Sequence, residues 1–255
     1  MPKLSLLVLV LLSTNLFAQL KTVPTLTPNI SLSESRQAVV VTTKNWNEVQ
    51  GKARLFEREN TQAKWKSVGA SFPIVVGKNG LAWSEDIANL LFEKPAAYKR
   101  EGDGKSPAGI FNLTSAFGSN KQPDYVKLPF TELLKSTECV DDTKSASYNQ
   151  IVDKYKIGNF DWDSSEKMLA VGAQYDLGVF VAHNSNPVKT GNGSCIFLHI
   201  WKDEKSGTAG CTAMKREHIE TLLRWLDKQK NPVLIQMPET SYRTYQKSWK
   251  LPKLK

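Results

Sequence analysis

Short apolar runs alternate with turn-forming residues in the first part of the chain, a pattern typical of β-strands. Four such runs precede residue 80, at positions 39–43, 53–57, 64–68 and 72–76. The polar residues 59–62 separate the second run from the third and predict a hairpin. The sequence Gly77-Lys78-Asn79-Gly80 predicts a turn after the fourth run. We therefore expect this part of the chain to consist mostly of strands.

The period of the pattern changes in the last third of the chain. Apolar runs at 179–182 and 195–200 predict two neighbouring buried strands. From Lys215 onward, apolar residues recur at helical spacing, and Asn231-Pro232 ends this helix before a strand at 233–235. The apolar residues at helical spacing are Ile219, Leu222, Leu223 and Leu226.

The middle of the chain is less regular. The segment 99–109 is rich in Gly, Pro and charge and is interpreted as a loop that enters a strand at Ile110-Phe111. Residues 119–168 are polar and poorly periodic, which predicts a long insertion with a functional role or a small structure of its own.

These elements predict one domain, from residue 38 to 238, that is mainly β with a few helices (α+β). A curved mixed sheet or an open β-sandwich would accommodate them, and the strand order stays open. Residues 239–255 form a basic, aromatic tail. A solvated chain end is the preferred interpretation of this tail, and a patch that holds an anionic polymer or a membrane surface is the alternative.

The amino terminus has the features of a secretory signal peptide. Lys3 provides a positive charge, residues 4–12 form an apolar run too short to cross a bilayer as a helix, and Ala18 lies near the expected cleavage site. We expect a signal peptide at 1–18 and a flexible leader at 19–37; an uncleaved anchor is the alternative. The mature protein would then be exported, periplasmic or associated with the cell wall.

Composition narrows the choice of partner. The chain has 255 residues, of which 40% are apolar, and this fraction excludes an intrinsically disordered protein. The net charge of +9 suits an anionic surface such as a wall polymer or a membrane. Nucleic acid would be equally attractive electrostatically, but export and the lack of a recognition motif argue against it.

Cys211 is the first candidate for chemistry. It lies in a turn of small residues before the predicted helix, where the helix macrodipole would favour a thiolate. Gly210 beside it would leave backbone N–H groups uncrowded, as an oxyanion site requires. The cysteines at 139, 195 and 211 lack the paired spacing of structural zinc sites, so a metal centre is not expected, although a buried unreactive thiol is an alternative.

A cysteine nucleophile usually works with a base, and the chain contains three histidines. His199 ends an apolar strand one short loop before Cys211, so it is the expected base. His183 ends the preceding strand. It could line the cleft together with Asn184, or it could make a structural hydrogen bond, and the two roles are about equally expected. His218 lies on the predicted helix and is interpreted as a surface residue.

Several separated motifs resemble the L,D-transpeptidase catalytic domain (YkuD-like) family. Thr208-Ala209-Gly210-Cys211 is similar to the family's active-site turn, and 106–111 is similar to its Thr-Pro-x-Gly-x-Phe strand entry. The sequences at 138–142, 148–153 and 193–201 resemble a secreted bacterial branch of the family. The resemblance covers roughly residues 70–238.

The resemblance implies an enzyme that acts on the stem peptides of peptidoglycan. Cys211 would form an acyl-enzyme thioester and His199 would transfer the proton, without a metal or an organic cofactor. Backbone N–H groups around Gly210, with neighbours Ala209 and Thr212, would hold the oxyanion. Transfer to an amine would make the protein an L,D-transpeptidase, and transfer to water an L,D-carboxypeptidase.

Two positions depart from the family pattern. Ala209 stands where a His is frequent, and Met214 where an Asn or Arg is frequent. Lys215 or Arg216 could compensate for Met214 in the substrate pocket, alongside Thr208. A non-catalytic peptidoglycan-binding module with a degenerate turn is the alternative function.

If Cys211 is the nucleophile, the other two cysteines remain for a bridge. An oxidising compartment would allow Cys139 and Cys195 to pair, which would tie the insertion to the strand of His199. Two buried reduced thiols are the alternative.

Overall fold

The computed structural model describes residues 32–90 and 97–254. The predicted signal peptide at 1–18 and most of the leader at 19–37 lie outside these residues. Within them, no helix combines the length and the apolar character needed to cross a membrane.

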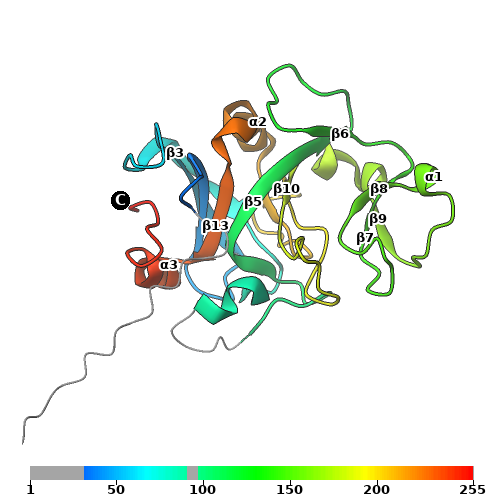
Figure 1. The fold of residues 1–255 in the computed structure, drawn as a ribbon, viewed down its shortest axis with the longest axis horizontal. Helices are drawn as coiled ribbons and strands as arrows, with labels where there is room; N and C mark the ends of the chain where they lie inside the picture. Colours follow the sequence, from blue (N-terminus) through cyan, green and yellow to red (C-terminus); the bar gives the residue numbers. More distant parts are fainter. Residues whose placement is uncertain (1–31, 91–96, 255) are drawn as a thin grey trace, which may run out of the picture.

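A ten-stranded mixed sheet forms the centre of the molecule (Figure 1). Neighbouring strands follow the order β10-β11-β12-β3-β2-β1-β13-β5-β4, and β6 pairs with β5. An additional pairing between β10 and β5 curls the sheet into a barrel. The strands are β1 (Gln37–Thr43), β2 (Gln50–Glu57), β3 (Lys66–Val75), β4 (Leu81–Trp83), β5 (Ser106–Gly118), β6 (Phe130–Glu132), β10 (Leu177–Val181), β11 (Phe197–Ile200), β12 (Thr212–Met214) and β13 (Val233–Pro238).

The apolar runs of the sequence occupy the centre of this barrel. Every residue of β1 and of β13 is buried, and these two strands pair in parallel. Strands that are buried on both faces have near-continuous apolar sequences, as these two do. The prediction of a mainly β fold with a few helices and a curved mixed sheet is confirmed, and closure into a barrel is the feature that the sequence left open.

Helices cover the barrel at several points. Ile219, Leu222 and Leu223 lie on the buried side of α2, which contacts β10 and β11. The helices are α1 (Lys154–Ile157), α2 (Arg216–Trp225) and α3 (Glu239–Tyr245), together with the 3₁₀-helices η1 (Glu85–Leu90), η2 (Met168–Tyr175) and η3 (Lys228–Lys230).

The insertion forms a lobe beside the barrel with a sheet of its own (Figure 1). Its strands are β7 (Thr137–Val140), β8 (Ile151–Asp153) and β9 (Ser165–Lys167), in the order β8-β7-β9. A disulfide joins Cys139 in β7 to Cys195, just before β11. These residues are 56 positions apart, and closing a loop of that size stabilises the fold by about 3–4 kcal/mol in the chain-entropy model.

The carboxy-terminal tail packs against the barrel. Tyr242 is completely buried, and the rings of Tyr245 and Trp249 stack at 4.5 Å between centroids. Trp83 of β4 contacts both of these rings. The preferred interpretation of residues 239–255 as a solvated end is therefore wrong, because their aromatic side chains bury apolar surface in the core.

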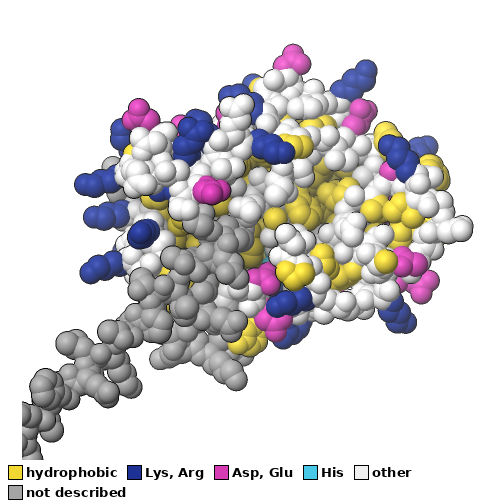
Figure 2. All heavy atoms as spheres, in the orientation of Figure 1, with side chains coloured by type: hydrophobic (Ala, Val, Ile, Leu, Met, Phe, Trp, Pro, Cys, Tyr) yellow, Lys and Arg dark blue, Asp and Glu magenta, His cyan; other side chains and the backbone are white. Residues whose placement is uncertain are grey.

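Charge is unevenly distributed over the surface in view. Figure 2 shows Lys and Arg side chains gathered along the edge that carries β3 and the carboxy-terminal end of the chain. The middle of the same face exposes apolar side chains. A positively charged edge is compatible with an anionic surface as a partner.

Candidate active site

The turn that carries Cys211 is fixed to the end of β3 by backbone hydrogen bonds. Thr208 N donates to Val76 O at 3.0 Å, and Lys78 N donates to Thr208 O at 2.8 Å. Gly207 makes this approach possible, because a Cβ atom there would lie 2.5 Å from the Cα of Lys78. The turn is thus held by the barrel.

Two hydroxyl groups hold the carbonyl oxygen of Cys211. The Thr208 hydroxyl donates to this oxygen at 2.6 Å and the Ser106 hydroxyl at 2.7 Å. Ser106 is oriented in turn by a hydrogen bond from Gly77 N. The backbone of the candidate nucleophile is therefore fixed on both sides.

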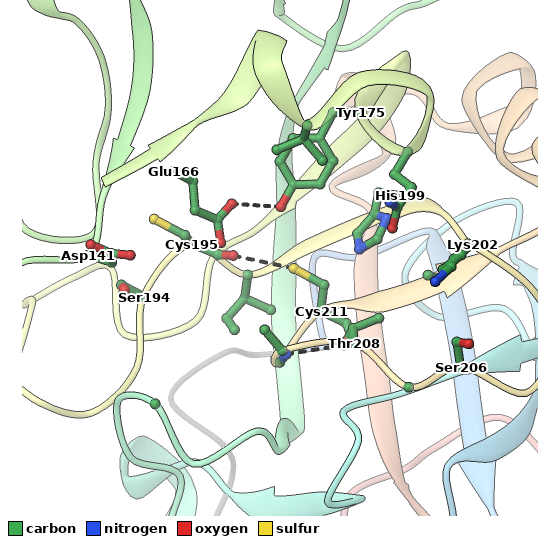
Figure 3. Close-up of a pocket in the computed structure, with 18 of the residues that line it drawn as sticks. Asp141, Glu166, Tyr175, Ser194, Cys195, His199, Lys202, Ser206, Thr208 and Cys211 are labelled. Atoms are coloured by element: carbon green, nitrogen blue, oxygen red, sulfur yellow. Dashed lines mark hydrogen bonds between the residues drawn. The ribbon is translucent and has the colours of Figure 1, made fainter. Parts of the chain in front are cut away.

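The side chain of Cys211 enters a cavity of about 440 Å³ (Figure 3). Only 6% of the residue is exposed. The sulfur accepts a hydrogen bond from Phe197 N at 3.3 Å and donates to Cys195 O at 3.4 Å. The thiol is thus enclosed by the loop before β11 while it still faces the cavity.

The environment of Cys211 differs from the one predicted. The strand β12 separates Cys211 from α2, so the thiol does not lie at the helix N-terminus. Burial raises the pKa of Cys211, and the nearby charge of Glu166 raises it further. The prediction of a thiolate stabilised by the macrodipole is wrong, because Thr212 to Met214 extend as a strand beside β11.

His199 lines the same cavity from β11. Its Nδ1 lies 2.8 Å from Ile200 O, and because a carbonyl only accepts, Nδ1 carries the hydrogen in the neutral ring. The lone pair of Nε2 remains to accept a proton. Burial lowers the pKa of His199 to about 4, so the imidazole is neutral at neutral pH.

Tyr175 and Glu166 complete the group of polar side chains around the thiol, and the sequence analysis missed both. Tyr175, in η2, packs its ring edge-on against His199 at 5.2 Å between centroids. Its hydroxyl donates to Glu166 Oε2 at 2.6 Å, and Tyr175 lines the cavity together with Cys211. Burial raises the pKa of Glu166 to about 7.

Glu166 lies in β9 of the insertion, directly opposite Cys139 in the pairing of β7 and β9. The disulfide from Cys139 to Cys195 places this pair beside the loop that encloses the thiol. The insertion therefore contributes a carboxyl group to the site. The predicted disulfide could have indicated that the insertion reaches the site, since this bond connects the insertion to the strand of His199.

The cavity carries charges of both signs. Lys99 and Lys202 line it together with Glu101, Asp141 and Glu166 (Figure 3). The side chain of Lys99 is only 3% exposed and pairs with Asp103 at 2.7 Å. Such a cavity can accept a ligand that carries both carboxylate and ammonium groups.

The predicted oxyanion residues divide into two groups. Ala209 and Gly210 line the cavity, as does Thr208, which was predicted for the substrate pocket, and Gly210 N donates to the Thr208 hydroxyl at 3.1 Å. Thr212 is buried, and its hydroxyl donates to Gln236 inside the barrel, outside the residues that line the cavity. The prediction that the backbone of Thr212 helps to hold the oxyanion is therefore wrong, because Thr212 does not line the cavity.

Four residues predicted for the substrate pocket lie outside the cavity lining: His183, Asn184, Lys215 and Arg216. His183 is buried with Nε2 2.8 Å from Asn192 O, and Asn184 bonds to backbone atoms of the loop that follows it. Lys215 pairs with Glu217, and Arg216 pairs with Asp176. For His183 the structure shows the alternative, a structural hydrogen bond. The assignments of Asn184, Lys215 and Arg216 to the substrate pocket are wrong, because other residues of the protein hold these side chains outside the cavity.

Met214 is completely buried in the core. The side chain at this position therefore cannot contact a substrate, and the neighbouring Lys215 and Arg216 do not replace it. Among the described residues, no group of His, Cys, Asp or Glu side chains could hold a metal ion.

A scan against protein-family models matches residues 52–235 to the L,D-transpeptidase catalytic domain, YkuD. Searches of curated proteins and of solved structures gave no significant match. The family match covers most of the chain and contains the cavity, the turn of Cys211 and the strand of His199. The chain belongs to the L,D-transpeptidase catalytic domain family.

Proposed function

We propose that the protein is an exported enzyme that modifies the stem peptides of peptidoglycan through an acyl-enzyme thioester on Cys211. The observation that carries the proposal is the presence of one free thiol and one neutral imidazole, those of Cys211 and His199, in the same cavity. A family that acts on peptidoglycan supports the substrate class.

In this mechanism the Cys211 sulfur attacks the carbonyl carbon on the donor side of a peptide bond. Because the thiol is protonated at rest, Nε2 of His199 accepts its proton as the carbon–sulfur bond forms. The imidazolium then gives this proton to the leaving amine when the carbon–nitrogen bond breaks. The products of the first half-reaction are a thioester and a free amine.

The carbonyl oxygen becomes an anion in the tetrahedral intermediate. Backbone N–H groups of the turn, at Ala209 and Cys211, are the proposed donors to it, and the fixed carbonyl of Cys211 holds this part of the turn in place. In the second half-reaction an amine or a water molecule attacks the thioester, and His199 accepts its proton. The carbon–sulfur bond then breaks, and the imidazolium returns this proton to the leaving Cys211 sulfur, which restores the free thiol.

The charges of the cavity support a peptide substrate with ionised groups. Lys202 offers a partner for a carboxylate, and Glu101 and Asp141 offer partners for an ammonium group. Peptidoglycan stems carry both kinds of group. Export is consistent with the disulfide between Cys139 and Cys195, because such bonds persist in oxidising compartments.

The proposal predicts the masses of the products when the protein is incubated with disaccharide–tetrapeptide fragments. We expect a fragment shortened by its terminal residue, a cross-linked dimer, or a fragment with an exchanged terminal residue, separated by chromatography and identified by mass spectrometry. Heat-denatured protein is the control. Unchanged fragments, combined with measurable binding, would contradict the enzyme and favour a binding module.

A further inference from the structure

We infer that Glu166 and Tyr175 form a positioning pair that controls the reactivity of Cys211, with Tyr175 able to donate its single hydroxyl hydrogen either to Glu166 or to the sulfur. The inference rests on the proposed role of Cys211 as the nucleophile. It assigns a function to the insertion, which supplies Glu166 through β9.

The geometry makes the two bonds compete. The Tyr175 hydroxyl donates to Glu166 Oε2 at 2.6 Å, and Tyr175 lines the same cavity as Cys211 and packs in the same cluster of buried side chains. A phenol has one hydrogen to donate. While the carboxylate holds this hydrogen, the sulfur faces the lone pairs of the phenol oxygen, and the thiolate is disfavoured.

Protonation of Glu166 reverses the arrangement. The carboxylic acid then donates its own hydrogen to the Tyr175 oxygen, and the phenol hydrogen is free to point at the sulfur. A hydrogen bond from Tyr175 stabilises the Cys211 thiolate and lowers the pKa of the thiol, whereas the negative charge of Glu166 raises it. Both effects favour the thiolate when Glu166 is neutral.

The surroundings of Glu166 place its pKa near neutral pH, so that it can be protonated there. Burial raises its pKa to about 7, the hydrogen bond from Tyr175 lowers it, and the charges of Asp141 and Glu101 raise it. Lys99 and Lys202 line the same cavity, and Lys99 is paired with Asp103. His199 is neutral above about pH 4, so it does not change its charge in this range.

The alkylation rate of Cys211 by iodoacetamide, measured against pH, tests the inference without any peptidoglycan. In the wild-type protein we expect the rate to rise with pH and to level off above about pH 7, where Glu166 ionises. In Glu166→Gln the rate continues to rise, and at pH 8 it exceeds that of the wild type by about tenfold, while at pH 5.5 the two rates agree.

A Tyr175→Phe background shows whether Glu166 acts through the phenol. The gain from Glu166→Gln at pH 8 should fall from about tenfold to less than about threefold, because only the direct effect of charge remains. Tyr242→Phe is the control: this buried tyrosine donates to Pro252 O and lies outside the cavity lining, so its pH profile should match the wild type.

The inference is overturned if Glu166→Gln keeps the wild-type levelling above pH 7, or if its gain is the same in the Tyr175→Phe background. If Glu166→Gln does not fold, Tyr175→Phe alone decides. Loss of the phenol must slow alkylation below pH 7, and an unchanged rate there refutes the pair. Because alkylation reads the thiol directly, these results stand apart from turnover of stem peptides.

Discussion

Replacing Cys211 by alanine will lower kcat/KM for stem-peptide turnover by about 10⁴-fold or more. The sulfur is the only free thiol among the described residues, and no other described nucleophile of comparable strength lines the cavity. Without it no thioester forms, and the remaining backbone donors stabilise only direct attack by water. Steady-state kinetics with a disaccharide–tetrapeptide donor measure the effect.

A second measurement separates lost chemistry from lost structure. A carbapenem acylates enzymes of this family. The intact mass of the wild-type protein should therefore increase by the mass of the bound drug, and the mass of the Cys211→Ala variant should stay unchanged. The variant should retain its disulfide and a cooperative unfolding transition, because alanine keeps the backbone bonds of Cys211 and removes only a sulfur that packs in a small cluster and makes weak hydrogen bonds. Full turnover in a folded Cys211→Ala variant would remove the proposed mechanism.

Replacing His199 by glutamine will lower kcat/KM at pH 7 by about 10²–10⁴-fold, the range that a general base contributes. The imidazole must be neutral to accept the thiol proton, and burial lowers its pKa to about 4. Activity of the wild type should therefore be lost as the pH falls through about 4 and the ring becomes protonated. The pH dependence of kcat/KM shows this acidic limb.

His218→Gln is the matched control for His199. His218 stacks on Phe72 outside the cavity lining, so its replacement should leave both the rate at pH 7 and the acidic limb within about twofold of the wild type. An equal loss in the two variants, or an acidic limb that persists in His199→Gln, would show that His199 is not the base.

The longer strands of the barrel were predictable because their buried residues form local apolar patterns in the sequence. The run at 39–43 is β-branched and becomes fully buried in β1, and the apolar positions of α2 recur at helical spacing. The tail after residue 238 was misread. Its charged residues suggest solvent, but Tyr242 and Trp249 bury apolar surface against the barrel.

The placement of Cys211 and His199 in one cavity was predictable because the motif places them close in sequence, but the electrostatics of the site were not. The pKa of the Cys211 thiol depends on β12, because this strand separates the thiol from the helix, and on Glu166, which comes from the insertion. With only three residues, β12 is too short to be recognised from a periodic pattern. Glu166 and Tyr175 lie only nine residues apart, but both are far in sequence from Cys211, whose cavity they line, and this long-range approach leaves no local pattern.

The covalent intermediate tests the central claim most directly. The protein is mixed with a tetrapeptide stem donor, quenched in acid within the first turnovers, digested and mapped by mass spectrometry. We predict that the donor tripeptide is attached to the peptide that contains Cys211, and that neutral hydroxylamine removes it, as expected for a thioester. Product that accumulates with no acyl group on Cys211, or with the acyl group on another residue, would contradict the account.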